Sequence, residues 1–241
     1  MDIAIMYSGG KDSTYAIQHA IEKGWDIKYL ISVKPTRKDC YLYHYATVEW
    51  TKELAKNFKT KYFLLKCSVA DPKKEAEIVN KLVARNQKVK RLKIDALVLG
   101  GTGLQETQLK SLQKALIPLK VEVFAAHAGM DHDKVMEEML AKGYEIMITQ
   151  VASDGLLKWL GTTLTKENFK ELQRDSIKYG FHIGFEGGYA DTLVIGAPIF
   201  KNNLEILEHK KVIEDQYCGH IVIKKARLVQ KVRTFRKLTI Y

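Results

Sequence analysis

The chain has 241 residues and a formal net charge of +11, a length that accommodates one large domain or two modest ones with a buried core. No apolar run is long enough for a membrane-spanning helix, and the N-terminus lacks the features of a secretory signal, so membrane insertion is excluded and a cytoplasmic protein is expected. The cysteines Cys40, Cys67 and Cys218 form no CxxC pair, which argues against a disulfide framework and against a zinc or iron–sulfur site.

The first predicted element is a short apolar strand, Ile3–Tyr7, which runs directly into the sequence SGGKDS at Ser8–Ser13 and then into a helical pattern. Gly9 and Gly10 can adopt backbone angles that other residues avoid. Their N–H groups can therefore form an anion-binding nest, to which the N-terminus of the following helix adds its positive dipole. The arrangement predicts a phosphate-binding site.

The polar side chains of this loop fit a nucleotide that carries a metal ion. Lys11 supplies a mobile cation, Ser8 and Ser13 supply hydroxyls, and Asp12 is explained if it holds Lys11 or a divalent cation that bridges the phosphates. The spacing differs from that of the P-loop and from the GxGxxG fingerprint. It resembles the PP-loop of the ATP pyrophosphatases, which cleave ATP between its α and β phosphates and transfer AMP to a substrate oxygen.

Short apolar runs alternate with amphipathic helical patterns as far as about residue 126. Strands are expected at Ile3–Tyr7, Ile27–Val33, Tyr62–Lys66, Ala96–Leu99 and Val121–Ala125, and helices at Tyr15–Lys23, Ala46–Phe58, Glu75–Lys90 and Glu106–Leu116. This series predicts an α/β fold with a doubly wound, mostly parallel sheet covered on both faces. In such sheets, ligands bind at the carboxyl ends of the strands.

The pattern changes after residue 126, and we expect a smaller α+β domain over residues 127–241. Helices are expected at Asp133–Lys142 and around Lys166–Tyr179, an apolar run at Tyr144–Val151, and strands at Thr192–Ile195, Leu204–Leu207 and Ile221–Ile223. These short strands favour antiparallel structure. His127 and His132 lie near two aspartates as in a metal cluster, but the spacing fits a loop and a helix capped by Asp131 or Asp133.

The second half contains the sequence GFEGGYADTLVIGAPIF at Gly184–Phe200. Together with the PP-loop, it resembles the diphthine–ammonia ligase family, whose members typically read GEGGEYET, a few apolar residues and then PLF. Tyr41–His44 is similar to the family's YMFH, and Val151–Gly161 is close to its VAxxGLxxxWLG stretch. The resemblance covers residues 1 to about 200 in order.

Two departures from the family pattern concern candidate site residues. Where the family reads EGGEYET, the chain reads EGGYADT from Glu186 to Thr192, so the middle carboxylate is absent and the last is shortened to Asp191. The Arg and Glu of the family's SxYQxxRVE segment also have no counterpart. A glycine-rich loop that includes Gly100 and Gly101 stands there instead, and such a loop either contacts phosphate or adenosine or simply turns the chain.

The resemblance implies an ATP-dependent amide ligase that uses Mg²⁺. Family members adenylate the carboxylate of diphthine, a modified histidine on a translation elongation factor, and ammonia then displaces AMP to form the amide; pyrophosphate is the other product. Catalytic roles are implied for Lys11, Asp12, Glu186 and Asp191, with the metal at Asp12. The residues expected to bind ATP are Ser8, Gly9, Gly10, Lys11, Asp12, Ser13, His44, Gly100 and Gly101.

Two of these residues admit more than one role. His44 could stack near the adenine, serve as a general base, or be an ordinary satisfied histidine. Glu186 could orient ammonia or the acyl-adenylate, or it could merely cap the Gly-Gly turn that follows it.

Lysines and arginines concentrate in two stretches. Residues 73–93 hold eight of them against two acidic residues, and residues 209–241 hold nine against two. Such patches favour acidic or nucleic-acid partners, although a solvated, lysine-rich surface explains them equally well. Cations at alternate positions near the C-terminus predict a strand face between Lys210 and Lys237 that docks a macromolecular substrate.

Two other functions remain open. A tRNA-modifying enzyme with a PP-loop would adenylate a base oxygen, and the basic patches would suit tRNA as its partner. A non-catalytic ATP- or AMP-binding protein would keep the loop without turnover, and steady release of AMP and pyrophosphate would exclude it.

Overall fold

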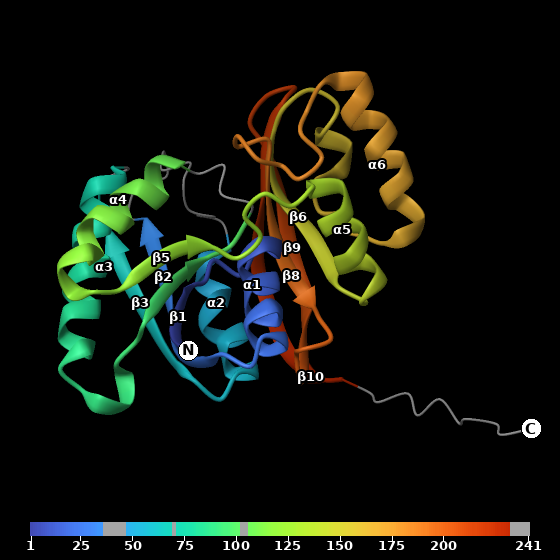
Figure 1. The fold of residues 1–241 in the computed structure, drawn as a ribbon. Coiled ribbons are helices and arrows are strands. Elements are labelled where there is room, and N and C mark those ends of the chain that lie inside the picture. Colours follow the sequence, from blue (N-terminus) through green and yellow to red (C-terminus); the bar gives the residue numbers. More distant parts are fainter. Residues whose placement is uncertain (36–46, 69–70, 102–105, 232–241) are drawn as a thin grey trace, which may run out of the picture.

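The computed structural model describes residues 1–35, 47–68, 71–101 and 106–231 and arranges them in two sheets with helices between and outside them (Figure 1). The first sheet has five parallel strands in the order β3-β2-β1-β4-β5. Their bounds are β1 (Asp2–Met6), β2 (Asp26–Pro35), β3 (Lys61–Cys67), β4 (Ala96–Leu99) and β5 (Glu122–Ala125). The predicted α/β class with a parallel sheet is confirmed.

Helices cover both faces of this sheet because successive strand side chains point to opposite sides. On β1, Ala4 belongs to the apolar cluster under α3 (Pro72–Gln87) and α4 (Glu106–Leu116), whereas Ile3 and Ile5 belong to the cluster that contains α1 (Lys11–Glu22). The strands are buried on both faces, which explains their continuous apolar sequences. The doubly wound arrangement is therefore confirmed.

The helix expected at Ala46–Phe58 is broken into three short turns. The described part contains η1 (Val48–Trp50), α2 (Thr51–Leu54) and η2 (Ala55–Asn57), and Ala46 itself lies outside the described residues. The Thr51 hydroxyl hydrogen-bonds the Val48 carbonyl and the Tyr62 hydroxyl. Contacts of this kind hold the segment in place although its helical hydrogen bonding is interrupted.

The second sheet is antiparallel and is built around β6 (Glu145–Ala152). It pairs with β7 (Thr163–Leu164), β8 (Ala190–Gly196) and β10 (Cys218–Gln230), and β10 pairs in turn with β9 (Asn202–Ile213). Figure 1 shows α5 (His132–Ala141) and α6 (Lys166–Tyr179) outside this sheet, with α1 and α2 between the two sheets. The remaining short turns are η3 (Lys90–Leu92), η4 (Ile117–Leu119) and η5 (Leu157–Trp159).

One apolar core joins the two sheets. A single buried cluster includes Ile5 of β1, Ala16 of α1, Met139 of α5 and Leu193 of β8. This continuity fixes how the second sheet sits against the phosphate loop. The exact boundary between the two domains at residues 126 and 127 stays a prediction.

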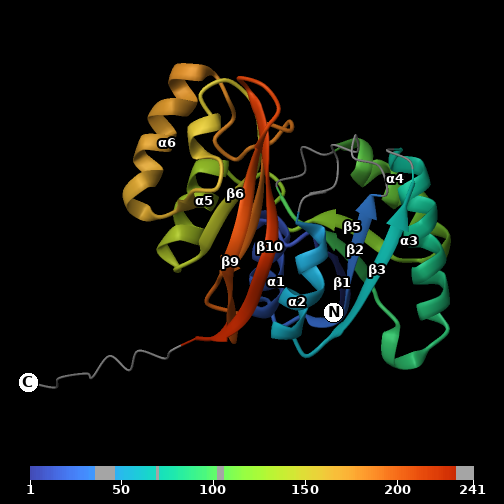
Figure 2. The same ribbon diagram turned by 180° about the vertical axis from the view of Figure 1, so that it is seen from behind.

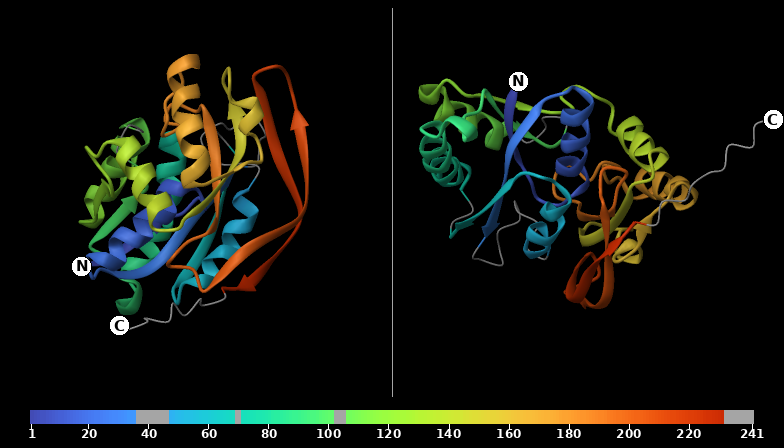
Figure 3. Two further views of the ribbon diagram at one scale, coloured as in Figure 1. Left: turned by 90° about the vertical axis from the view of Figure 1, so that its right-hand side faces the viewer. Right: turned by 90° about the horizontal axis from the view of Figure 1, so that it is seen from below.

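The hairpin of β9 and β10 is much longer than the two short strands expected there. Figures 2 and 3 show these strands as a long pair along the edge of the second sheet. Most side chains beyond Leu207 on β9 are exposed, so this part of β9 has no apolar run by which to recognise it. Among the residues that the structure describes, no helix combines the length and apolar character needed to cross a membrane.

Candidate functional site

The loop between β1 and α1 has the backbone geometry of an anion-binding turn. Gly9 has a positive φ of 78°, which favours glycine, and Gly10 is extended and precedes the first residue of α1, Lys11. The N-terminus of α1 has no side-chain cap. An uncapped helix N-terminus behind a glycine turn presents N–H groups and a positive dipole to an anion.

The hydroxyls of Ser8 and Ser13 brace this loop. The two oxygens are 3.1 Å apart, the Ser8 N–H donates to Ser13 Oγ at 3.1 Å, and the Gly10 N–H donates to Ser8 Oγ at 3.3 Å. Ser13 Oγ also donates to the Gly10 carbonyl at 3.2 Å. The loop is therefore preformed by its own side chains, and a phosphate group can compete for the same N–H groups.

Lys11 and Asp12 form a close ion pair at the start of α1. Lys11 Nζ lies 2.5 Å from Asp12 Oδ2, and the exposed fractions of the two side chains are 5% and 30%. An ammonium that is removed from water needs a compensating charge. Asp12 therefore holds the Lys11 cation in the loop, which was one of the two explanations for an acidic residue beside a phosphate site.

The two glycines that follow β4 lie against the loop. A Cβ at Gly100 would sit 2.5 Å from the Ser13 backbone nitrogen, so only glycine allows β4 to end this close to α1. Gly101 has a φ of +86°, and a Cβ there would lie 3.4 Å from Glu186 Oε1. The strand-end loop thus touches both the phosphate loop and the second half of the chain, and its role in ligand binding stays a prediction.

Glu186 shares the electrostatic environment of the ion pair. Burial raises the pKa of its carboxyl above the ordinary value, the negative charge of Asp12 raises it further, and the positive charge of Lys11 opposes both. The structure therefore brings Lys11, Asp12, Gly101 and Glu186 together, although Asp12 and Glu186 are 174 positions apart in the sequence.

Strand β8 fastens the phosphate loop to the second sheet. The Lys11 N–H donates to Thr192 Oγ1 at 3.1 Å, and the Val194 N–H donates to the Gly9 carbonyl at 2.9 Å. Thr192 is buried. Sequence reasoning missed this threonine as a site residue, although it stands next to Asp191 in the motif.

Asp191 precedes Thr192 on β8 and pairs in register with Gln150 of β6. Because neighbouring side chains on a strand point to opposite faces, Thr192 and Asp191 do not point the same way. The catalytic role of Asp191 stays a prediction. His44 lies outside the described residues, and its role stays a prediction as well.

The segment between β5 and α5 contains a buried histidine and the N-terminal cap of α5. His127 is buried, its ring stacks on Tyr15 with centroids 4.8 Å apart, and burial lowers its pKa to about 4. Asp131 caps α5 by accepting from the N–H groups of Asp133 and Lys134. The expected cap is therefore confirmed at Asp131.

The basic hairpin is partly neutralised across its two strands. Lys224 Nζ lies 2.9 Å from Glu208 Oε1, and Arg227 Nε lies 2.6 Å from Glu205 Oε2. All four side chains are exposed, so these pairs contribute little to stability. They do reduce the excess positive charge of the face that the sequence predicted to dock a macromolecule, and that role stays a prediction.

The carboxylates of the site suit a hard divalent cation. Mg²⁺ is usually held by one or two carboxylates together with substrate phosphates and water. Asp12 is close enough to Glu186 for its negative charge to raise the pKa of the Glu186 carboxyl. Within the described residues no group of three or more His, Cys, Asp or Glu side chains is arranged to hold a metal by itself. A cation here would therefore complete its coordination with phosphate oxygens and water.

The chain matches two families over most of its length. Residues 1–116 match the family described as diphthamide synthase N-terminal domain, and residues 131–229 match the one described as diphthamide synthase C-terminal domain. It is 26% identical over 264 residues to diphthine–ammonia ligase from Homo sapiens, covering 100% of this chain and 92% of that protein. It is 24% identical to the protein of the same name from Danio rerio, covering 88% and 89%.

Two further matches differ in coverage or in strength. The diphthine–ammonia ligase from Schizosaccharomyces pombe is 26% identical and covers 96% of this chain, but the match spans only 40% of that longer protein. Among solved structures, a predicted subunit of tRNA methyltransferase from Methanocaldococcus jannaschii superimposes with a TM-score of 0.41 and 13% identity, covering 82% of this chain and 98% of that one.

Proposed function

Because the chain belongs to the diphthamide synthase family, we propose that it is an AMP-forming amide ligase. It adenylates the carboxylate of diphthine on a translation elongation factor and amidates it with ammonia. The observation that carries this proposal is the convergence of Lys11, Asp12 and Glu186 at one preformed phosphate loop. A phosphate loop with a fixed lysine and an adjacent, half-buried carboxyl suits the attack of a carboxylate on the α phosphorus of ATP.

The first step activates the substrate acid. A carboxylate is a poor electrophile at neutral pH, so its oxygen attacks the α phosphorus of ATP, and the bond between the α phosphorus and the bridging oxygen breaks. Pyrophosphate leaves with the electron pair. Lys11 and the N–H groups at the start of α1 stabilise the charge on the departing group because they are fixed in place before the reaction.

The second step replaces AMP. The ammonia nitrogen attacks the acyl carbon and loses a proton, the carbon–oxygen bond to AMP breaks, and AMP leaves with the electron pair. Glu186 lies beside Gly101, where the two halves of the chain meet, and this position supports a role in orienting either the acyl-adenylate or the incoming nitrogen. Mg²⁺ bound at Asp12 would neutralise phosphate charge during the first step.

Thr192 links the second sheet to the phosphate loop. Its hydroxyl accepts from the Lys11 N–H, so the position of β8 determines how the first turn of α1 meets the phosphates. An acceptor protein bound against the second sheet could thereby influence the geometry of the nucleotide site.

The basic hairpin is the proposed contact for the macromolecular substrate. Binding to the elongation factor and to bulk tRNA should be measured across a salt series. Each phosphate of a single-stranded region that is neutralised adds about 0.7 to the negative slope of log affinity against log salt, whereas exposed ion pairs with a protein respond more gently. If reversing the charges of Lys224, Lys225 and Arg227 changes neither affinity, the face is only a solvated surface.

Product analysis tests the proposed function. The protein should convert diphthine on the elongation factor to diphthamide in the presence of ATP, Mg²⁺ and ammonium, with AMP and pyrophosphate formed in equal amounts. ADP and orthophosphate as the main products would contradict the proposal. AMP release with tRNA but not with the elongation factor would favour the tRNA-modifying alternative.

A further inference from the structure

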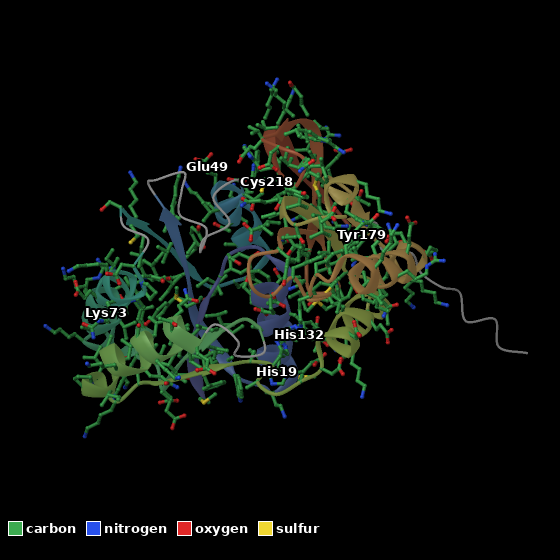
Figure 4. The ribbon with its side chains drawn as sticks, turned by 90° about the horizontal axis from the view of Figure 1, so that it is seen from above. His19, Glu49, Lys73, His132, Tyr179 and Cys218 are labelled. Atoms are coloured by element: carbon green, nitrogen blue, oxygen red, sulfur yellow. The ribbon has the colours of Figure 1, made fainter. Side chains whose placement is uncertain are left out.

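Two histidines meet beside the phosphate loop. His132 is the first residue of α5, and His182 lies in the segment between α6 and β8. Their ring centroids are 4.5 Å apart and their planes are almost perpendicular, at 89°. Figure 4 labels His132 between α1 and α5. Both side chains are half-buried, so each keeps part of its surface open to solvent.

The backbone at Gly184 holds this pair in place. The Gly184 N–H donates to His182 Nδ1 at 3.2 Å, so a neutral His182 carries its proton on Nε2. A Cβ at Gly184 would overlap Nδ1 of His132, so only glycine lets that ring approach so closely. Glu186 follows two residues later, which ties the histidine pair to the carboxyl of the site.

The electrostatic environment of His132 is that of the phosphate loop. Burial lowers its pKa most, and the neighbouring His182 and the Lys11 cation lower it further, while Asp12 and Asp131 act in the opposite direction. These effects favour the neutral imidazole of His132, the form that can accept a proton. Lys11 and Asp12 also act on the pKa of Glu186, so the imidazole of His132 and the carboxyl of Glu186 both lie near this ion pair.

We infer that His132 is the proton acceptor for the ammonia nitrogen and that His182 is its positioning residue. This inference rests on the proposed function. When ammonia forms the new carbon–nitrogen bond, the nitrogen becomes cationic; one of its protons passes to the imidazole of His132, and the carbon–oxygen bond to AMP breaks with the electron pair leaving on AMP. The imidazolium then returns its proton to solvent, so that atoms and charge balance.

The test separates the two half-reactions. Adenylation is measured as diphthine-dependent exchange of labelled pyrophosphate into ATP, which requires no ammonia. Amide formation is measured with ammonium and, separately, with hydroxylamine. Hydroxylamine is the weaker base, so its nitrogen becomes a stronger acid after attack and loses its proton to water without the help of a protein base.

The variant His132→Gln should lose ammonia-dependent amide formation by about 100-fold, the lower range for general-base catalysis. Pyrophosphate exchange should change less than about threefold, and hydroxylamine-dependent turnover should fall far less than the ammonia reaction. His182→Asn keeps an acceptor for the Gly184 N–H and should retain more ammonia-dependent activity than His182→Phe. His19→Gln serves as the matched control and should behave like the wild type, because His19 is also a half-buried histidine whose pKa is lowered by burial, but it lies in the last turn of α1.

Three results would overturn the inference. The first is a wild-type rate of amide formation in His132→Gln, and the second is an equal loss of activity with ammonia and with hydroxylamine. The third is a loss of pyrophosphate exchange in the same variant, because that loss would assign His132 to adenylation or to folding. A wild-type protein without pyrophosphate exchange would instead refute the proposed function itself.

Discussion

Glu75 allows a direct test of how burial changes the pKa of a carboxyl group in this protein. The side chain lies on α3 with 0% of its surface exposed, and Gln108 Nε2 of α4 donates to both of its carboxyl oxygens at 3.0 and 3.1 Å. Burial raises the pKa of Glu75 from 4.5 to about 8, while the Gln108 hydrogen bond acts in the opposite direction. The folded protein therefore keeps this carboxyl protonated at pH 7.

The sign of the effect on stability follows from where the proton is held. Between pH 4.5 and about 8 the unfolded chain loses the proton while the folded protein retains it, so the free energy of unfolding falls as the pH rises. The slope is roughly 1.4 kcal/mol per pH unit, and over the whole interval the loss is roughly 5 kcal/mol. This part of the free energy of unfolding is fully present below pH 4.5, the pKa of the carboxyl in the unfolded chain, and is lost above about pH 8, its pKa in the folded protein.

Glu75→Gln removes this titration while keeping the size of the side chain and a partner for Gln108. The variant should match the wild type near pH 4.5 and should exceed it by several kcal/mol at pH 8.5, as measured by urea unfolding across the pH range. Glu77→Gln is the matched control, because Glu77 lies on the same helix but is exposed, and its ion pair with Lys74, at 3.3 Å, is exposed as well. A difference between Glu75→Gln and wild type that stays constant with pH would refute the reasoning.

Substitutions at three further positions test the phosphate loop. Lys11→Ala should weaken ATP binding and remove the partner of the Asp12 carboxylate, and unchanged affinity by calorimetry would contradict its role. Thr192→Val leaves the buried Lys11 N–H without its acceptor and should cost about 1–3 kcal/mol of unfolding free energy; Thr192→Ser should restore most of it, and equal losses in both variants would point to packing instead. Gly100→Ala places a Cβ 2.5 Å from the Ser13 nitrogen, so it should displace the first turn of α1 and lower the affinity for nucleotide. An unchanged affinity would contradict this expectation, because it would show that the end of β4 can move away from α1 without disturbing the loop.

The parallel sheet was predictable because its strands are short and buried on both faces. The apolar runs expected at Ile3–Tyr7 and Ala96–Leu99 correspond to β1 and β4 within two residues, since an apolar run bounded by polar residues is typical of a strand between two layers of helices. The hairpin was underestimated for the opposite reason. Most residues of β9 beyond Leu207 and of β10 beyond Ile223 are exposed and are held by pairing between the two strands, so the hydrogen bonding extends beyond the apolar runs.

The phosphate loop itself could be identified from the sequence because its chemistry is local. The two glycines, Lys11 and Asp12 are consecutive, and a turn that precedes a helix N-terminus needs few long-range contacts to take its shape. The same local reasoning placed Gly100 and Gly101 at the end of a strand, where a parallel sheet gathers its ligand loops.

The identity of the residues that meet at this loop was decided only by the tertiary structure. Glu186 could be singled out by a family motif, but its nearness to Asp12, the hydrogen bond from Lys11 to Thr192, and the contact of His132 with His182 depend on how β8 and α5 pack against α1. The sequence determined the local loop and the alternation of strands and helices, because these follow from neighbouring residues. Packing determined the rest, because one apolar core shared by both sheets fixes distances between residues far apart in the chain.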